Sequence, residues 1–97
     1  MIRVVVAEDS LLVREGIEKL LGAQPDLDVV ALCVDLPELL AAVEAHRPDA
    51  VLTDIRMPPG NTDEGIVAAS TLRETHPDVG VVVLSQYVEP TYALQLF

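Results

Sequence analysis

The hydrophobic positions of the chain fall into short apolar runs separated by longer stretches with helical spacing. The apolar runs have the length and residue types of β-strands, and they cover Ile2 to Ala7, Asp28 to Val34, Ala50 to Thr53 and Val79 to Leu84. Between them, apolar residues recur every three or four positions, as in amphipathic helices. Because strands that alternate with helices are typical of a parallel sheet covered by helices, the pattern predicts an α/β fold.

Two of the predicted helices have clear boundaries. The first runs from Ser10 to about Gly22, and its expected core residues are Val13, Ile17, Leu20 and Leu21. The second follows Asp35, an expected N-cap, with Glu38 three residues later completing a capping box. It should end where the sequence reads His46-Arg47-Pro48.

The rest of the chain is less regular. Met57 to Asn61 contains prolines and a glycine, so we expect neither helix nor strand there. A third helix should begin near Thr62 or Asp63, and its expected core residues are Ile66, Ala69 and Leu72. Pro90 favours another helix, which Phe97 cuts off. We therefore expect residues 1–97 to be one domain that is incomplete at its C-terminal end.

Composition adds limits on the partners of the chain. At 97 residues with 51% hydrophobic residues, it can form one small core. The formal net charge of −10 repels phosphate backbones and anionic lipid, so we expect this segment to bind neither nucleic acid nor membrane directly. No signal sequence or membrane-length apolar run is visible, which favours a cytoplasmic protein. Cys33, the only cysteine, lies in an apolar run and is expected to be a buried small hydrophobic residue.

Polar side chains follow several of the predicted strands. Glu8 and Asp9 follow the first strand, Asp54 follows the third and Ser85 follows the fourth. The carboxyl ends of parallel strands meet at one edge of a sheet, where ligands bind. Carboxylates gathered there repel one another, and a hard ion such as Mg²⁺ relieves that repulsion.

This arrangement indicates phosphoryl chemistry at Asp54. With a metal ion beside it, the Asp54 carboxylate is a nucleophile that can form an aspartyl phosphate, and Ser85 can donate a hydrogen bond to a phosphoryl oxygen. A structural alternative exists for single residues, because Asp9 or Ser10 can instead cap the first helix.

Three motifs resemble the receiver domain of bacterial two-component response regulators, most closely those with a LuxR-type DNA-binding output. They are Val4 to Ser10, Leu52 to Pro58 and Val82 to Ser85. The resemblance implies a flavodoxin-like (CheY-like) doubly wound parallel sheet of order 2-1-3-4, with strand 5 and helix 5 missing from this chain. It also implies phosphotransfer from a sensor histidine kinase, and Mg²⁺ held by Glu8 or Asp9, by Asp54 and by the backbone carbonyl of Arg56.

The chain departs from the family in places. The family has a lysine on its fifth strand, whereas Lys19, the only lysine here, lies in the first predicted helix. The segment before Gly65 is a few residues longer than the family's usual spacing. Gln86 stands where the family generally has a small residue. Arg56 and Tyr87 resemble variable positions that tune dephosphorylation.

These observations favour a phosphorylation-dependent signalling switch without turnover of a separate substrate. Its output would be dimerisation and, through a DNA-binding domain absent from this chain, transcription. One alternative is a receiver-like scaffold that cannot be phosphorylated. Another is an aspartyl-phosphate hydrolase, but that class needs an acid where Arg56 stands. In the family's strand order Val79 to Leu84 becomes an uncharged edge, which favours a homodimer or larger assembly.

Overall fold

Within the described residues, the strands and helices follow the order that the hydrophobic pattern predicts, and the helix predicted near Pro90 lies outside those residues. The computed structural model describes residues 1–56, 58, 60 and 63–84. Its elements are β1 (Ile2–Ala7), α1 (Leu11–Gly22), β2 (Leu27–Cys33), α2 (Leu36–His46), β3 (Ala50–Asp54), α3 (Glu64–Thr75) and β4 (Gly80–Leu84). The bounds agree with the predicted ones to within one or two residues. Among the described residues, no helix is long and apolar enough to cross a membrane.

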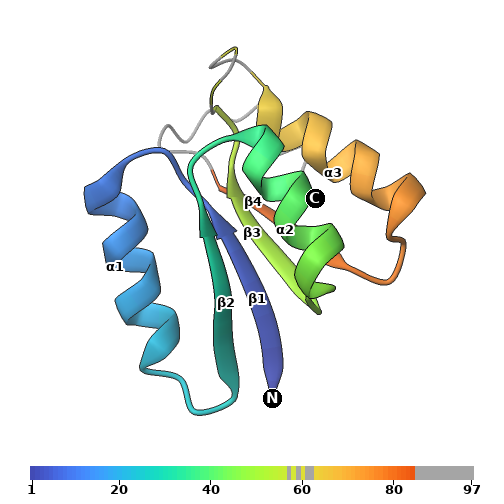
Figure 1. Ribbon diagram of the computed structural model, residues 1–97. Coiled ribbons are helices and arrows are strands. Elements are labelled where there is room, and N and C mark those ends of the chain that lie inside the picture. The colour runs from blue at the N-terminus through green and yellow to red at the C-terminus, as the bar shows by residue number, and fades with distance from the viewer. Residues whose placement is uncertain (57, 59, 61–62, 85–97) are drawn as a thin grey trace.

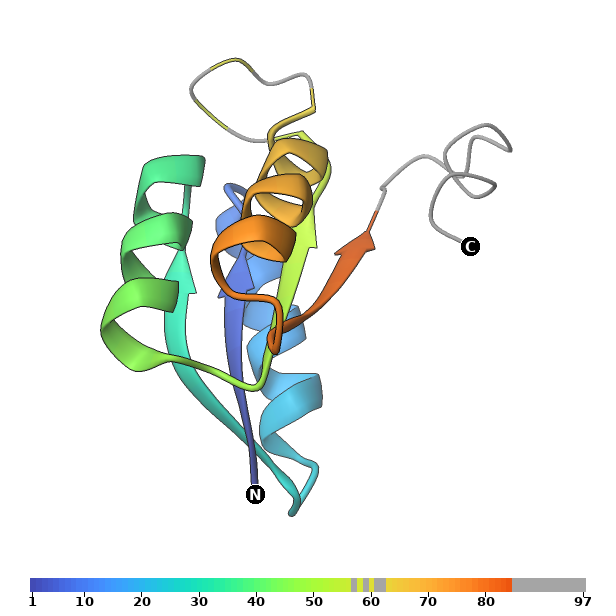
Figure 2. The same cartoon turned by 90° about the vertical axis from the view of Figure 1, so that its right-hand side faces the viewer.

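The strands form one parallel sheet in the order β2-β1-β3-β4, which confirms the predicted α/β fold. Helix α1 lies on one face, and α2 and α3 lie on the other (Figures 1 and 2). In register, Ala7 at the end of β1 pairs with Cys33 of β2 and with Thr53 of β3. The carboxyl ends of the two central strands therefore lie side by side, and the residues that follow them meet at one edge.

The core lies mainly between the sheet and the pair α2 and α3. It contains Val5 and Ala7 of β1, Val51 of β3, Leu39 and Val43 of α2, and Ala68 and Leu72 of α3. Helix α1 contributes no fully buried residue, and Leu20 is 72% exposed. The expectation that Leu20 packs inward was therefore wrong, because α1 rests on the sheet with the side that carries Val13, Ile17 and Leu21, which are half-buried.

The packing side of α3 also differs from the prediction. Leu72 is buried as expected, but Ile66 and Ala69 are only half-buried, and Gly65 and Ala68 are buried instead. The reason is that the first turn of α3 rests on the end of β3, which rotates Ile66 and Ala69 toward β4. There they line a groove of about 420 Å³ together with Val79, Val81, Val83, Pro77, Ser70 and Arg73.

Two helices begin with the predicted caps. The Ser10 hydroxyl accepts a hydrogen bond from the Val13 N–H at 3.5 Å, so Ser10 caps α1. Asp35 Oδ1 accepts from the Glu38 N–H at 2.8 Å, while Glu38 Oε1 accepts from the Val34 N–H at 3.0 Å. This arrangement is a capping box that closes one residue earlier than the usual form.

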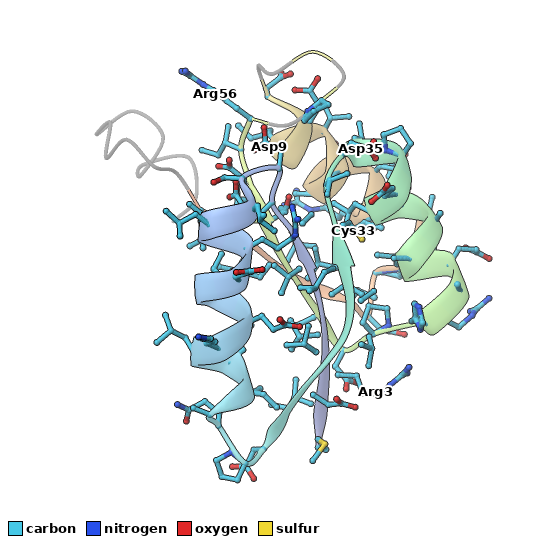
Figure 3. All side chains as sticks on the ribbon, turned by 60° about the vertical axis from the view of Figure 1, so that its left-hand side comes forward. Arg3, Asp9, Cys33, Asp35 and Arg56 are labelled. Atoms are coloured by element: carbon cyan, nitrogen blue, oxygen red, sulfur yellow. The ribbon has the colours of Figure 1, made fainter. Side chains whose placement is uncertain are left out.

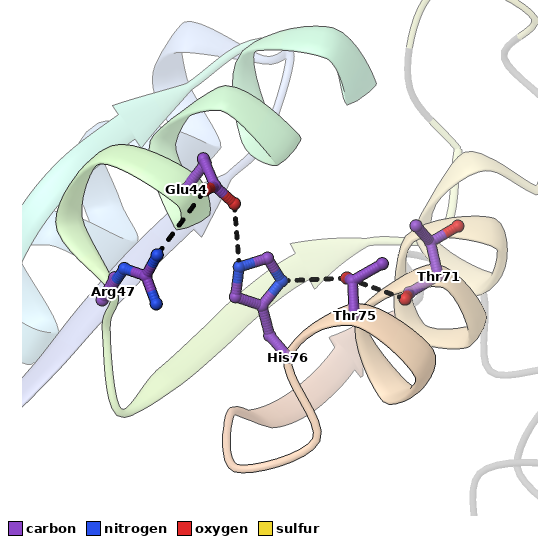
Figure 4. Close-up of polar contacts among 5 residues, drawn as sticks. All are labelled: Glu44, Arg47, Thr71, Thr75 and His76. Carbon is purple, nitrogen blue, oxygen red and sulfur yellow. Dashed lines mark hydrogen bonds and ion pairs between the residues drawn. The ribbon is translucent and has the colours of Figure 1, made fainter.

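Polar contacts join the C-terminal ends of α2 and α3 (Figure 4). His76 Nε2 lies 3.0 Å from Glu44 Oε2, and His76 Nδ1 lies 2.9 Å from the Thr75 hydroxyl, which donates to the Thr71 carbonyl. Glu44 also lies 3.6 Å from Arg47, although both side chains are largely exposed. These contacts are at the opposite end of the sheet from the carboxyl edge (Figures 1 and 4).

Candidate functional site

The carboxylates that follow β1 and end β3 come together at the carboxyl edge of the sheet. One oxygen from each of Glu8, Asp9 and Asp54 lies within 4.8 Å of the others. Glu8 and Asp54 are buried, at 3% and 8% exposure, whereas Asp9 is exposed. The sequence prediction that these side chains converge is confirmed, because β1 and β3 are neighbours in the sheet.

Backbone and side-chain contacts fix Glu8 on both sides. Its N–H donates to the Cys33 carbonyl at 2.9 Å, and its Oε1 accepts from the Ser10 N–H at 3.0 Å. The Arg14 guanidinium donates to the Glu8 carbonyl at 2.9 Å. Arg14 was not among the predicted site residues. It lies in the first turn of α1, and its side chain holds the backbone of Glu8.

Asp54 is oriented by its own neighbours in the chain. The Ile55 N–H donates to Asp54 Oδ1 at 2.8 Å, and the Thr53 hydroxyl donates to the Asp54 carbonyl at 3.0 Å. Thr53 is itself fully buried, so this contact is shielded from solvent. One carboxylate oxygen of Asp54 is thereby held at a fixed place relative to the end of β3.

Gly65 lets α3 approach the Asp54 backbone more closely than another residue could. A Cβ at this position would lie 2.0 Å from the Asp54 carbonyl oxygen and 2.8 Å from the Ile55 Cα. The Gly65 N–H also donates to the Ile55 carbonyl at 2.8 Å. The absence of a side chain at Gly65 therefore allows α3 to support the end of β3.

Burial and mutual repulsion change the acidity of the cluster. The pKa of Glu8 is raised from 4.5 to about 7, chiefly by burial and then by the charges of Asp54 and Asp9, although the hydrogen bond from the Ser10 N–H lowers it. Burial, followed by repulsion from Asp9, raises the pKa of Asp54 above its ordinary value, although the Ile55 N–H partly offsets this. Such a site favours a bound cation.

The donor set fits Mg²⁺. The cluster offers carboxylate oxygens only, from adjacent strand ends, and hard oxygen donors are the ligands that Mg²⁺ prefers. Glu8 and Asp54 supply buried oxygens, and the exposed Asp9 leaves room for water ligands.

The remaining predicted site residues stay predictions. Arg56 lies at the same end of the sheet as Asp9, and its side chain is exposed and extends outward (Figure 3). Ser85, Gln86 and Tyr87 lie outside the described residues.

Comparison with known proteins decides the family. The response regulator receiver domain family matches residues 4–97. The chain belongs to the response regulator receiver family. This receiver domain is 36% identical over 90 residues to the oxygen regulatory protein NreC of Staphylococcus epidermidis, covering 93% of this chain and 40% of that protein.

Solved structures agree. The signal receiver domain of the response regulator NarL from Mycobacterium tuberculosis superposes with a TM-score of 0.87 and 34% identity, covering 98% of this chain and 74% of that one. A LuxR-family response regulator from Aurantimonas sp. SI85-9A1 gives a TM-score of 0.88 with 26% identity, covering 100% of this chain and 67% of that one. The fold and family expected from the motifs are therefore confirmed.

Membership in the family gives the general function. Receiver domains are signalling domains of two-component systems, they interact with histidine kinases, and they bind Mg²⁺ at an acidic pocket. The Glu8, Asp9 and Asp54 cluster has the composition of such a pocket. The chain spans about two fifths of the length of NreC.

Proposed function

We propose that this receiver domain is a phosphorylation-dependent switch in which Asp54 accepts a phosphoryl group from a sensor histidine kinase. The observation that carries the proposal is the meeting of Glu8, Asp9 and Asp54 at one edge, with Asp54 Oδ1 fixed by the Ile55 N–H. An Asp that is buried, oriented and next to further carboxylates is suited to nucleophilic attack in the presence of a cation.

The transfer step follows from the chemistry of the groups. A carboxylate oxygen of Asp54 attacks the phosphorus of a phosphohistidine, an acyl phosphate O–P bond forms, and the P–N bond breaks with its electrons returning to the histidine nitrogen. Mg²⁺, when bound, neutralises charge on the phosphoryl oxygens. Glu8 and Asp9 would hold the ion with Asp54 and the Arg56 backbone carbonyl, and the Ser85 hydroxyl would donate to a phosphoryl oxygen.

Neighbouring residues would set how long the phosphoryl group persists. Arg56, Gln86 and Tyr87 follow the proposed site residues Asp54 and Ser85 within two positions. They would control access of water to the acyl phosphate and so tune dephosphorylation.

The output of the switch would be a change in association. In the part of the chain that the structure describes, β4 pairs with β3 alone, and Val82 and Leu84 are 54% and 43% exposed. An apolar strand edge is a template for pairing with another chain, so we place a homodimer contact at β4. In a longer cytoplasmic protein, this association would control a DNA-binding domain and hence transcription.

Phosphoryl acceptance can be tested by mass. The protein is incubated with Mg²⁺ and a small acyl-phosphate donor, and its intact mass is compared with that of Asp54→Asn. We expect a gain of one phosphoryl group in the wild type and none in the variant. Equal gains in both proteins would contradict the assignment of Asp54.

The dimer contact is tested by light scattering at micromolar concentration. We expect a dimer or larger species in the wild type and a shift toward monomer in Val82→Lys, because a charge on an edge strand opposes edge-to-edge pairing. Two monomeric proteins would contradict the β4 contact.

A further inference from the structure

Glu64 is a buried carboxylate that lies outside the acidic cluster. It is the first residue of α3 and is 7% exposed. Its Oε2 accepts a hydrogen bond from the Gly60 N–H at 2.6 Å. Hydrogen bonds to ionised acceptors are short and about twice as strong as neutral ones. The beginning of α3 is therefore fastened to a backbone position four residues earlier in the chain.

The segment after Asp54 is fixed to α3 before it reaches Arg56. The Ile55 N–H lies 3.1 Å from the Leu84 carbonyl, and the Ile55 carbonyl accepts from the Gly65 N–H at 2.8 Å. Ile55 is also buried. The backbone that enters Arg56 therefore has a defined position.

Two contacts hold the described backbone beyond Arg56. The Pro58 carbonyl accepts from the Leu36 N–H at the start of α2, at 3.1 Å, and the Gly60 N–H donates to Glu64. The Leu36 contact uses backbone atoms alone. The Gly60 contact depends on one side chain, so a substitution at Glu64 removes it without changing the residues of the segment itself.

We propose that Glu64 is a positioning residue for the acidic site, which holds the segment after Asp54 so that the Arg56 carbonyl faces the metal position. This inference rests on the proposed function, which assigns that carbonyl to Mg²⁺. The position of Glu64 favours a carboxylate in this role, because the N-terminus of α3 stabilises a negative charge there.

The experiment compares wild type, Glu64→Ala and Glu64→Gln, with Glu74→Ala as the matched control. Glu74 is an exposed acid of the same helix, so its loss changes net charge equally. Mg²⁺ is titrated against the protein and its Kd is read from backbone amide shifts in ¹⁵N NMR spectra. The chemical shift of the Gly60 amide proton reports directly on its hydrogen bond to Glu64. Phosphoryl acceptance from acetyl phosphate is then measured at saturating Mg²⁺.

We expect Glu64→Ala to raise the Mg²⁺ Kd by about tenfold, as loss of a supporting residue behind metal ligands usually does. At saturating Mg²⁺ most of the phosphoryl acceptance should return. Glu64→Gln keeps an oxygen acceptor, so its Mg²⁺ Kd should lie between those of the wild type and Glu64→Ala. The Gly60 amide proton of this variant should shift upfield. Glu74→Ala should match the wild type.

A folded Glu64→Ala with the wild-type Kd would overturn the inference. If Glu64→Ala does not fold, Glu64→Gln decides the question. An unchanged chemical shift of the Gly60 amide proton in that variant would overturn the inference that Glu64 holds Gly60. A wild type that binds no Mg²⁺ would contradict the proposed function instead. The Gly60 amide would still show in that case whether Glu64 holds the segment.

Discussion

Substitution of Gly65 by alanine tests how α3 supports the phosphoacceptor. An added Cβ would lie 2.0 Å from the Asp54 carbonyl oxygen, whereas real Cβ contacts are essentially never closer than 3.0 Å. The obstacle is backbone, which cannot rotate away as a side chain can. The start of α3 or the end of β3 must therefore move by about 1 Å, a displacement large enough to misplace a reacting group.

The expected loss of stability can be worked from this clash. Overpacking costs about 1–3 kcal/mol, and alanine in a helix offsets about 1 kcal/mol of this relative to glycine. Because the clash is severe, we expect Gly65→Ala to lower the free energy of unfolding by about 2 kcal/mol. Gly16 in α1 is the matched control, because a Cβ there meets no atom within 4 Å. Gly16→Ala should stabilise the protein by about 1 kcal/mol.

The assay is urea unfolding followed by circular dichroism, together with the rate of phosphoryl acceptance from acetyl phosphate. The two variants should differ by about 3 kcal/mol in the free energy of unfolding. Gly65→Ala should also accept the phosphoryl group about 100-fold more slowly, because Asp54 is displaced. If both variants are as stable and as reactive as the wild type, α3 does not fix Asp54 in the way described.

Three further predictions follow from single side chains. Because burial raises the pKa of Glu8 from 4.5 to about 7, the folded protein holds an extra proton between these values, so the metal-free protein should lose stability as pH rises through this window. The loss should approach about 3 kcal/mol, since each tenfold change in proton affinity is about 1.4 kcal/mol. Mg²⁺ affinity should rise over the same pH range. Glu8→Gln should lose the pH dependence of stability, and a variant that keeps the wild-type profile would contradict the role of Glu8. Burial raises the pKa of the Cys33 thiol to about 11, so alkylation at pH 8 should be at least about 100-fold slower in the folded protein than in urea, and equal rates would contradict this. Asp35→Ala should cost about 1 kcal/mol in urea unfolding through loss of the α2 cap, while Glu18→Ala on the exposed side of α1 should change stability by less than about 0.5 kcal/mol, and equal effects would refute the cap.

Much of the fold was predictable because its signals are local. Apolar runs bounded by polar residues locate β1 and β3 to within a residue, and the caps at Ser10 and Asp35 mark where helices begin. The cluster of Glu8, Asp9 and Asp54 was predictable as well, since carboxyl ends of parallel strands share an edge.

What the sequence did not predict depends on how elements pack. Leu20 has the spacing of a core residue, yet it is exposed because α1 contacts the sheet with another side. Glu64 is an acid at a helix start, where an exposed side chain is usual, and the structure shows that it is buried and accepts a hydrogen bond from the Gly60 N–H. The role of Gly65 follows from the distance between α3 and β3. None of these three facts can be predicted from the spacing of residues along the chain.

The most direct test of the central claim is the site of phosphorylation. After incubation with an acyl-phosphate donor and Mg²⁺, the protein is reduced with borohydride, which converts an aspartyl phosphate to homoserine, and its peptides are sequenced by mass spectrometry. We predict homoserine at position 54 and aspartate at position 9. Homoserine at position 9, or at neither position, would contradict the assignment of Asp54 as the phosphoacceptor.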